Sequence, residues 1–374
     1  MGIGSVTIVK VDGSQGDFKT AERLYLYLGG IGDPDLAGTI IPIGGATDLD
    51  KALGPGESEL KTQITAARQN ARSENFVCCA LGIPEGSDWK ELLYAALDKP
   101  SDLNIEAAVL CTPFESKTDV QAAYAAAAEV LARFAKFITV IGCCTGVDKS
   151  TETWGTYTTR ISALNDGVAA ERVMIVPLLH GNDLGCVCGR LCDPAVSIAD
   201  SPMRVATGAL IGLGDDPVDK NGDPLIMATI QTLAGKRFCV PQWYPGYDGI
   251  YWADMTTLAA ESSDYQVYEN LRVVVYCPRR VRILAIARIA NRMLNNTPSS
   301  IEANKTYFSR PLREASRTIT LGSIELPAMI RPPEANDVTI TWTSRTEVSI
   351  GLTVRPYNCP KKITVYIGLD LSGE

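Results

Sequence analysis

Apolar runs and helical patterns alternate along the first half of the chain. The runs are short and rich in Val, Ile, Leu and Cys, as in strands buried on both faces, and we expect strands at residues 38–43, 75–81, 105–111, 136–143 and 172–179. Between them, apolar positions at helical spacing predict helices at residues 47–53, 57–72 and 117–135. This β-α-β-α order indicates an α/β fold, with a mainly parallel sheet flanked by helices.

The pattern changes after a loop-rich stretch at residues 215–250. The segment NLRVVVY (270–276) has the composition of a strand. We expect a helix directly after it, because arginines there separate apolar residues near helical spacing, at Val281, Leu284, Ile289 and Leu294. Three further strands are expected, at residues 337–343, 347–357 and 361–371. This half of the chain therefore predicts an α+β domain.

The last of these segments, KKITVYIGLDL, alternates strictly between apolar and other residues. One face of the strand carries Ile363, Val365, Ile367, Leu369 and Leu371. Such a strand needs a sheet edge, which either the same subunit or a neighbouring one can supply. The segment SVTIVKV (5–11), which includes Val6, Ile8 and Val9, is a second candidate arm.

The patterns together predict four parts in chain order. These are an N-terminal arm (1–20), an α/β domain (21–245), an α+β domain with extended strand arms (246–360) and a C-terminal arm strand (361–374).

Charge is distributed unevenly over the 374 residues. The formal net charge is −8, which disfavours nucleic acid as the main partner. Residues 271–317 contain ten Lys or Arg and two acids, so this block carries +8 and the rest of the chain carries −16. A basic block in an acidic protein suits self-assembly or an acidic partner. Five of its arginines suggest a basic helix face, either solvated or in contact with an acidic protein: Arg279, Arg280, Arg282, Arg288 and Arg292.

Composition and the first residues indicate in which compartment the protein is expected. No run of about 18 apolar residues is present, so we expect no insertion into a membrane. The first residues lack the layout of a signal peptide, and together with eleven cysteines this indicates a reducing compartment. Cys78–Cys79 and Cys143–Cys144 lie in apolar strand-like runs, where adjacent side chains point to opposite faces of a sheet.

The best candidate for a metal site combines the single histidine with three nearby cysteines: His180, Cys186, Cys188 and Cys192. Zinc sites need four such ligands in a tetrahedral array, but the spacing matches no common zinc motif. We therefore favour a packed glycine- and cysteine-rich helix and expect no metal. The segment DPVDKNGDP resembles a calcium loop, but Pro217 and Ala228 occupy ligand positions, so we expect a surface turn.

Signatures of nucleotide enzymes are incomplete in this chain. The stretch from Gly30 and Gly32 begins like a dinucleotide loop, but Asp35 stands where the third glycine belongs. Neither a GxxxxGK[ST] loop nor a GxSxG elbow is present. The residues alone leave open a cytoplasmic α/β enzyme that uses carboxylate or cysteine chemistry on a small molecule.

The segment DGIYWADMTTLAAESSDYQVYENLRVV is more specific than any of these. It resembles a motif of the contractile-tail sheath proteins of phages and related injection systems. In that motif a Gly-x-Tyr segment leads to a Thr-Leu pair, a Ser-Asp-Tyr cluster and an Arg-Val before a long helix. The matching residues are Gly249, Tyr251, Thr257, Leu258, Ser263, Asp264, Tyr265, Arg272 and Val273. The resemblance covers about residues 172–374.

The resemblance implies a structural, non-enzymatic subunit without a cofactor, in a virion tail assembled in the cytoplasm of the host bacterium. It implies rings of six subunits stacked around an inner tube, which contract to drive the tube through a cell envelope. Expected partners are further copies of the chain, the inner tube protein, and the baseplate and tail terminator proteins. The terminal strands would add to the C-terminal domains of neighbours, and the five arginines named above would face an acidic tube.

Overall fold

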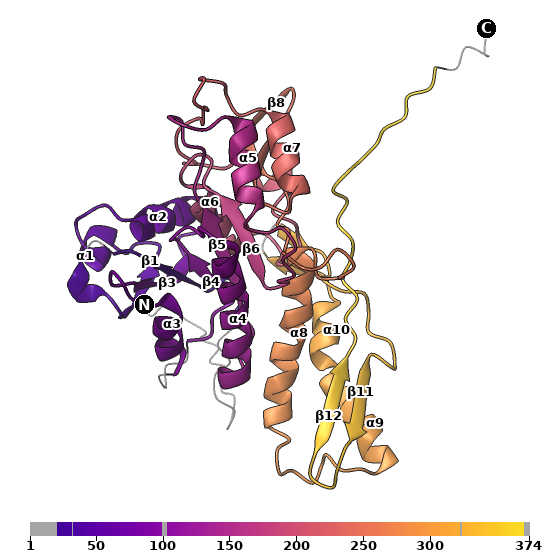
Figure 1. Cartoon of the computed structure of the whole chain (residues 1–374). Coiled ribbons are helices and arrows are strands. Elements are labelled where there is room, and N and C mark those ends of the chain that lie inside the picture. The colour runs from indigo at the N-terminus through magenta and orange to yellow at the C-terminus, as the bar shows by residue number, and fades with distance from the viewer. Residues whose placement is uncertain (1–20, 32, 99–102, 322–323, 370–374) are drawn as a thin grey trace, which may run out of the picture.

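A six-stranded sheet forms the centre of the larger part of the molecule (Figure 1). The computed structural model describes residues 21–31, 33–98, 103–321 and 324–369. The strand order is β2-β3-β1-β4-β5-β6, with β1 at Tyr25–Gly29, β2 at Ile40–Gly44, β3 at Val77–Gly82, β4 at Ala107–Leu110, β5 at Thr139–Cys144 and β6 at Val173–Pro177. All neighbours pair in parallel except β2, which is antiparallel to β3. The mainly parallel sheet expected from the sequence is confirmed.

Strand β1 was not predicted, although it lies in the middle of the sheet. Its sequence YLYLG is short, and each of its five residues is buried. Tyr25 and Tyr27 point to one face of the sheet, and Leu26 and Leu28 point to the other. The alternation of β1 is therefore satisfied on both faces within the same subunit.

Helices cover both faces of the sheet. One face packs against α1 (Leu49–Leu53), α2 (Glu59–Ala71) and α6 (Asp183–Cys192). The other packs against α3 (Trp89–Asp98), α4 (Lys117–Phe134), α5 (Trp154–Ser162) and α7 (Met227–Gly235). Short 3-10 turns occur at η1 (Pro34–Leu36) and η2 (Val205–Thr207). The helices expected at 47–53, 57–72 and 117–135 are confirmed, whereas α3, α5 and α7 were not predicted.

The adjacent cysteines divide between the two faces of the sheet as expected. Cys78 and Cys143 pack in the core on the α2 side, and Cys79 and Cys144 pack in the core on the α4 side. Burial raises the pKa of the Cys144 thiol to about 12. These thiols therefore act as small apolar side chains rather than as reactive groups.

Helix α6 packs closely against α2. A Cβ added to Gly185 would lie 2.2 Å from the carbonyl oxygen of Gln63, and one added to Gly189 would lie 2.2 Å from that of Ala67. Only glycine permits this approach of the two backbones. All ten residues of α6 are buried, so the predicted glycine- and cysteine-rich packed helix is confirmed.

The strand expected at residues 270–276 is wrong, because these residues belong to helix α8 (Tyr268–Ile286). The β-branched run favoured a strand, but the burial pattern has helical periodicity. Leu271 and Val275 face the core of the sheet, whereas Val273, Cys277 and Val281 enter a second core. Tertiary burial on two sides outweighs the local preference for a strand.

The second core lies below the sheet in Figure 1 and holds the rest of the α+β half. It packs α8 against α9 (Pro298–Phe308), α10 (Arg310–Ala315) and a two-stranded sheet of β11 (Val338–Trp342) and β12 (Val348–Leu352). Two more hairpins are formed by β7 (Pro241–Tyr244) with β8 (Tyr247–Trp252) and by β9 (Ile319–Leu321) with β10 (Ile324–Leu326). The strand expected at 347–357 ends at Leu352.

The expected final strand forms no ladder within the subunit. Residues 361–369 have no strand partner in the described part of the chain, and they extend away from the body (Figure 1). The candidate N-terminal arm with Val6, Ile8 and Val9 lies outside the described residues, as does Leu371. Among the described helices, none has both the length and the apolar composition needed to cross a bilayer.

Candidate assembly interface

The C-terminal arm, which we define as residues 362–369, leaves the body at a well-anchored root. Lys361 lies between two carboxylates, with its Nζ 2.5 Å from Asp254 Oδ2 and 2.6 Å from Glu269 Oε1. Just before it, Cys359 Sγ approaches the carbonyl oxygen of Ala199 at 3.6 Å. The chain is therefore held to the body as far as Lys361.

Electrostatics favour this contact in spite of partial burial. Burial by itself lowers the pKa of Lys361, but Glu269 and Asp254 outweigh it and hold that pKa above its ordinary value. Burial and the neighbouring Asp254 carboxylate raise the pKa of Glu269, and Lys361 opposes them. The ammonium group thus compensates two carboxylates that would otherwise repel each other.

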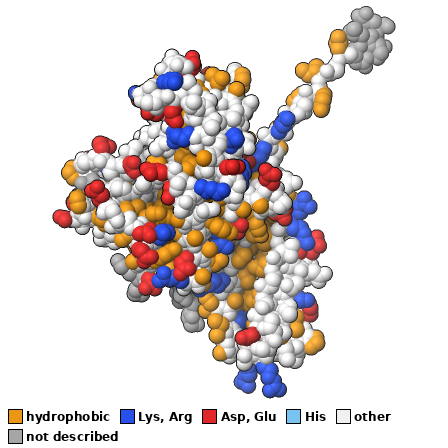
Figure 2. All heavy atoms as spheres, in the orientation of Figure 1, with side chains coloured by type: hydrophobic (Ala, Val, Ile, Leu, Met, Phe, Trp, Pro, Cys, Tyr) orange, Lys and Arg blue, Asp and Glu red, His pale blue; other side chains and the backbone are white. Residues whose placement is uncertain are grey.

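Beyond Lys361 the arm exposes nearly all its apolar surface. The exposed fractions are 77% for Ile363 and Val365, 95% for Ile367 and 83% for Leu369, and Tyr366 is also exposed. Figure 2 shows hydrophobic side chains along the arm, clear of the body. A folded protein rarely exposes such a series of apolar side chains unless another molecule covers them.

Several sheet edges could accept an added strand. The two-stranded sheets β9–β10 and β11–β12 have no third strand in the described part of the chain. One edge of the main sheet is already covered, because Leu258 N donates to the carbonyl oxygen of Val173 (2.9 Å) and Ala170 N donates to that of Leu258 (2.7 Å). Cys239 N adds a 2.9 Å bond to the carbonyl oxygen of Ile175 on the same edge.

The family-motif residues from Thr257 to Tyr265 come together in one loop. Thr257 is fully buried, and its Oγ1 donates to the carbonyl oxygen of Tyr265 at 2.6 Å. Ser263 Oγ accepts from Tyr265 N at 3.1 Å, while the side chains of Asp264 and Tyr265 are exposed. With Leu258 on the edge of β6, these contacts fix the loop that leads into α8.

Gly249 and Tyr251 shape the β7–β8 hairpin. Gly249 has a φ of +97°, and an added Cβ would lie 2.6 Å from the Cβ of Ala209. Tyr251 Oη donates to the carbonyl oxygen of Asp248 at 2.9 Å and packs beside Tyr244 and Tyr247. These two motif positions therefore have local structural roles.

The motif arginine joins the two halves of the molecule. Arg272 on α8 binds Glu106, just before β4, through Nε–Oε1 (2.5 Å) and Nη2–Oε2 (3.0 Å), and both side chains are buried. Burial alone would raise the pKa of Glu106, but Arg272 outweighs it and holds that pKa below its ordinary value. Arg23 N also donates to Glu106 Oε2 at 2.5 Å. A bidentate pair of this kind fixes the orientation of α8 on the sheet.

The five arginines expected on one basic face divide into two groups. Arg279 and Arg280 are partly buried and contact Glu22 at 3.5 and 3.2 Å. Arg282 is exposed on α8. Arg288 and Arg292 lie beyond Ile286, where α8 ends, so the expectation that they belong to this helix is wrong.

The metal and calcium candidates have structural roles. His180 Nδ1 lies 2.9 Å from Asp183 Oδ1 at the start of α6, and Cys186 Sγ approaches the carbonyl oxygen of Ile211 at 3.4 Å. Within the described residues, no group of three or more His, Cys, Asp or Glu could hold a metal ion. Asp219 Oδ1 accepts from the backbone of Asn221 and Asp223, so residues 215–223 include the expected surface turn.

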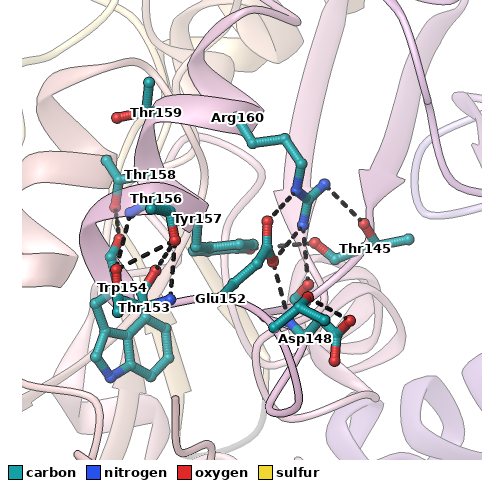
Figure 3. A network of polar contacts seen from close by, with 12 residues as sticks. Thr145, Asp148, Glu152, Thr153, Trp154, Thr156, Tyr157, Thr158, Thr159 and Arg160 are labelled. Carbon is teal, nitrogen blue, oxygen red and sulfur yellow. Dashed lines mark hydrogen bonds and ion pairs between the residues drawn. The ribbon is translucent and has the colours of Figure 1, made fainter. Parts of the chain in front are cut away.

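A polar network that sequence reasoning missed fixes the loop between β5 and α5 (Figure 3). Glu152 binds Arg160 through Oε1–Nε (2.6 Å) and Oε2–Nη2 (3.0 Å), and Arg160 Nη1 donates to Thr145 Oγ1 at 3.1 Å. Bonds from Ser150 and Thr151 lower the pKa of Asp148 to about 2. These bonds close the loop that leads into α5.

Two family models together match nearly the whole chain. The model described as DUF2586, N-terminal domain matches residues 3–256, and the model described as DUF2586, C-terminal domain matches residues 264–372. A curated relative from Haemophilus phage HP1, which is named as a tail sheath protein, is 40% identical over 373 residues, with 98% of each chain covered. The chain belongs to the contractile tail sheath family. It is accordingly a structural tail protein and not an enzyme.

Solved sheath structures share the fold of this sheath chain. The helical sheath of the anti-feeding prophage in the contracted state has a TM-score of 0.59 at 14% identity, and the match covers 98% of this chain and 100% of that one. A sheath tail protein from Desulfitobacterium hafniense has a TM-score of 0.52 at 11% identity, covering 92% and 96%. At these identities the likeness concerns the fold alone.

Proposed function

We propose that this sheath subunit polymerises as stacked hexameric rings around an inner tube, and that the polymer contracts to drive the tube through a cell envelope. The observation that carries the proposal is the C-terminal arm, which has an anchored root at Lys361 and an exposed apolar face from Ile363 to Leu369. An alternating segment without a partner in its own subunit is suited to complete the sheet of a neighbour.

The β11–β12 sheet of a neighbouring subunit is the acceptor that we favour. It has only two strands in the described part of the chain and belongs to the α+β half, residues 246–360, which we place toward the tube. The α/β part, residues 21–245, would face outward. The N-terminal segment with Val6, Ile8 and Val9 is proposed as a second arm.

Connections of this kind are strong enough to survive contraction. If an arm makes about eight backbone hydrogen bonds at a net ~1 kcal/mol each, it contributes about 8 kcal/mol per connection. A head-to-tail contact that does not close on itself builds a helical polymer. Subunits tethered through flexible arms could rotate and slide while staying connected.

The remaining partners follow from this role. The exposed arginines at the end of α8 and beyond it would face the inner tube, and the ends of the polymer would meet baseplate and tail terminator proteins. Assembly would take place in the cytoplasm of the host bacterium, and the product would be part of the virion tail.

Deleting residues 362–374 tests the proposal while keeping Lys361 in place. We expect a folded monomer with an unchanged melting temperature and no tubes, because the apolar side chains of the described arm, from Ile363 to Leu369, are at least three-quarters exposed. Sedimentation velocity and negative-stain microscopy would measure assembly. Tubes formed by the truncated chain, or a truncated monomer that unfolds, would contradict the arm's role.

A further inference from the structure

The C-terminal arm repeats the sequence of strand β12. Residues 348–352 read VSIGL and residues 365–369 read VYIGL, so the two segments differ only at their second position. β12 is paired with β11 in its own subunit, whereas the arm has no strand partner within the described residues. The arm therefore carries the side-chain pattern of a strand that already belongs to this sheet.

The outer edge of β12 has backbone groups available for a further strand. Thr353 N donates to the carbonyl oxygen of Asp337, the residue opposite it, at 2.8 Å. Because hydrogen-bonded pairs alternate along an antiparallel ladder, every second residue of β12 turns its N–H and C=O away from β11. Those residues are Val348, Ile350 and Leu352. Within the described part of the chain, no hydrogen bond joins their backbone groups to another element.

Burial distinguishes the two edges of the β11–β12 sheet. On β11, Val338 and Ile340 are 2% and 8% exposed, so their side chains are already covered by the second core. On β12, Val348, Ile350 and Leu352 pack against the same core but remain partly exposed. An apolar strand beside β12 would continue this face and complete its burial. We therefore favour the edge of β12 over that of β11.

The outer face of β12 has room for one large side chain. Gly351 is exposed, and a Cβ added to it would lie 2.5 Å from Oγ1 of Thr339, so a side chain fits there only if Thr339 moves. Ser349, next along this face, is small and exposed. On the arm, Tyr366 is 91% exposed. An aromatic ring placed across from a glycine covers the backbone that the glycine leaves bare.

We propose that the arm of one copy adds antiparallel to the outer edge of β12 in a neighbouring copy, with Ile367 opposite Ile350 and Tyr366 across from Gly351. This register rests on the proposed function, in which the β11–β12 sheet accepts the arm, and it goes further by specifying edge, direction and alignment. On the inner face it pairs apolar residues only: Ile363 with Val354, Val365 with Leu352, and Leu369 with Val348.

Two features of the sequence favour the antiparallel direction. Since both segments read Val-x-Ile-x-Leu, either direction matches their apolar residues. Parallel pairing, however, would place Gly368 opposite Gly351, where neither strand offers a side chain to pack. Antiparallel pairing places Gly368 opposite Ser349 instead, and it also joins Thr364 to Thr353.

The alternation fixes the alignment within the antiparallel direction. A shift by one residue would turn the apolar face of the arm toward solvent. A shift by two residues would place Leu369 opposite Thr346 in one sense, or Ile363 opposite Pro356 in the other. The proposed register is the one in which all four apolar residues of the described arm meet apolar partners.

Disulfide cross-linking in assembled polymers tests the register. Pairs on the outer face are the non-hydrogen-bonded ones, with Cα atoms about 4.5 Å apart, which a disulfide can bridge. The matched variant is Ser349→Cys with Gly368→Cys, and Thr353→Cys with Thr364→Cys is a second pair in the same register. Ser349→Cys with Tyr366→Cys reports parallel pairing, and Thr341→Cys with Tyr366→Cys reports pairing on β11.

Each variant is assembled under reducing conditions, checked for tubes by negative-stain microscopy, and then oxidised. Non-reducing SDS gels separate covalent ladders between subunits from single chains. The wild type and the single-cysteine variants give the background, because the native thiol of Cys359 is partly exposed.

We expect ladders from the two matched pairs, roughly tenfold stronger than from the other two pairs. A ladder from Ser349→Cys with Tyr366→Cys instead would show that the arm runs parallel, and one from Thr341→Cys with Tyr366→Cys would place it on β11. Either result overturns the register and leaves the role of the arm intact. Tubes without any ladder above background would mean that the arm does not lie on this sheet. A wild-type chain that forms no tubes would contradict the proposed function itself.

Discussion

Strand β1 and the C-terminal arm have the same kind of sequence in different surroundings. YLYLG in β1 and ITVYIGL in the arm are both short and mainly apolar, and in each the side chains alternate in type along the strand, Tyr with Leu in β1 and apolar with other residues in the arm. In β1 the residues from Tyr25 to Leu28 are 0% exposed, and strands pair on both sides. In the arm, the residues from Ile363 to Leu369 include side chains more than three-quarters exposed.

The difference shows what a hydrophobic pattern does and does not specify. Alternation indicates that a segment needs burial and hydrogen-bond partners, but it does not indicate which molecule supplies them. β1 obtains both from its own chain. The arm is anchored only at Lys361, so in the proposed polymer its free energy of burial is gained on assembly rather than on folding.

The largest decrease in the free energy of unfolding should come from Glu106→Gln. Glu106 binds Arg272 on α8 and the backbone N–H of Arg23, two residues before β1. The substitution leaves the buried Arg272 guanidinium without its carboxylate, and we expect a loss of about 3–5 kcal/mol in denaturant unfolding. Adding Arg272→Met should restore much of that loss. If Glu106→Gln alone were as stable as the wild type, the Glu106–Arg272 pair would not hold the sheet to α8.

The pH dependence of the wild type sharpens this prediction. The pKa of Glu106 is lowered from its ordinary value of 4.5, so the stabilisation is present above pH 4.5 and is lost as the pH falls through the folded-state pKa. The wild type and Glu106→Gln should therefore differ most near neutral pH and converge in acid. If the difference in the free energy of unfolding between the two proteins stayed constant from neutral to acid pH, the lowered pKa of Glu106 would be contradicted.

A smaller loss is expected from Gly189→Ala, which acts on the helix layer covering β1. The added Cβ would meet the backbone of Ala67, so α6 must move away from α2, at a cost of about 2–3 kcal/mol. Gly155→Ala in α5 is the matched control, because its nearest neighbour atom would be 3.9 Å away. That control should leave the unfolding free energy unchanged or raise it by about 0.5–1 kcal/mol.

Lys361→Met should have the smallest effect, because it acts at the root of the arm. Lys361 and Asp254 are each about a quarter exposed while Glu269 is buried, and we expect a loss of about 1–2 kcal/mol in monomer stability that shrinks at high salt. Lys362→Met is the control, since Lys362 is exposed on the arm. Equal melting temperatures for the two variants would mean that the root is not anchored through Lys361.

Local patterns in the sequence predicted most of the sheet but not its middle strand. The strands from β2 to β6 lie in short, almost wholly apolar runs, and such runs carry their own signal. β1 directly follows a polar segment, and its position in the sheet became evident only from the strands that pair with it. The run at 270–276 was misread because β-branched residues favour strands, whereas two separate cores require Leu271 and Val273 to lie on different sides of a helix.

The sequence predicted the arm as a segment but could not predict the contacts that anchor it. Lys361 binds Asp254, 107 residues away, and Arg272 binds Glu106 at a separation of 166. Pairings over such distances depend on the folded chain and leave no local pattern. The same holds for Arg280, whose contact with Glu22 spans 258 residues and removes it from the surface that charge alone suggested.

Helix α8 also has a mechanical consequence. A single helix carries Glu269, which binds the root of the arm, Arg272, which binds Glu106 beside the sheet, and the exposed Ile286 at its last position. A force applied at Ile286 is therefore transmitted along one helix rather than through a loop, although Pro278 has no backbone N–H and removes one of the hydrogen bonds that resist stretching. A displacement of Ile286 that carries α8 with it would also move Glu269, to which the root of the arm is bound, so the two ends of the subunit are mechanically linked.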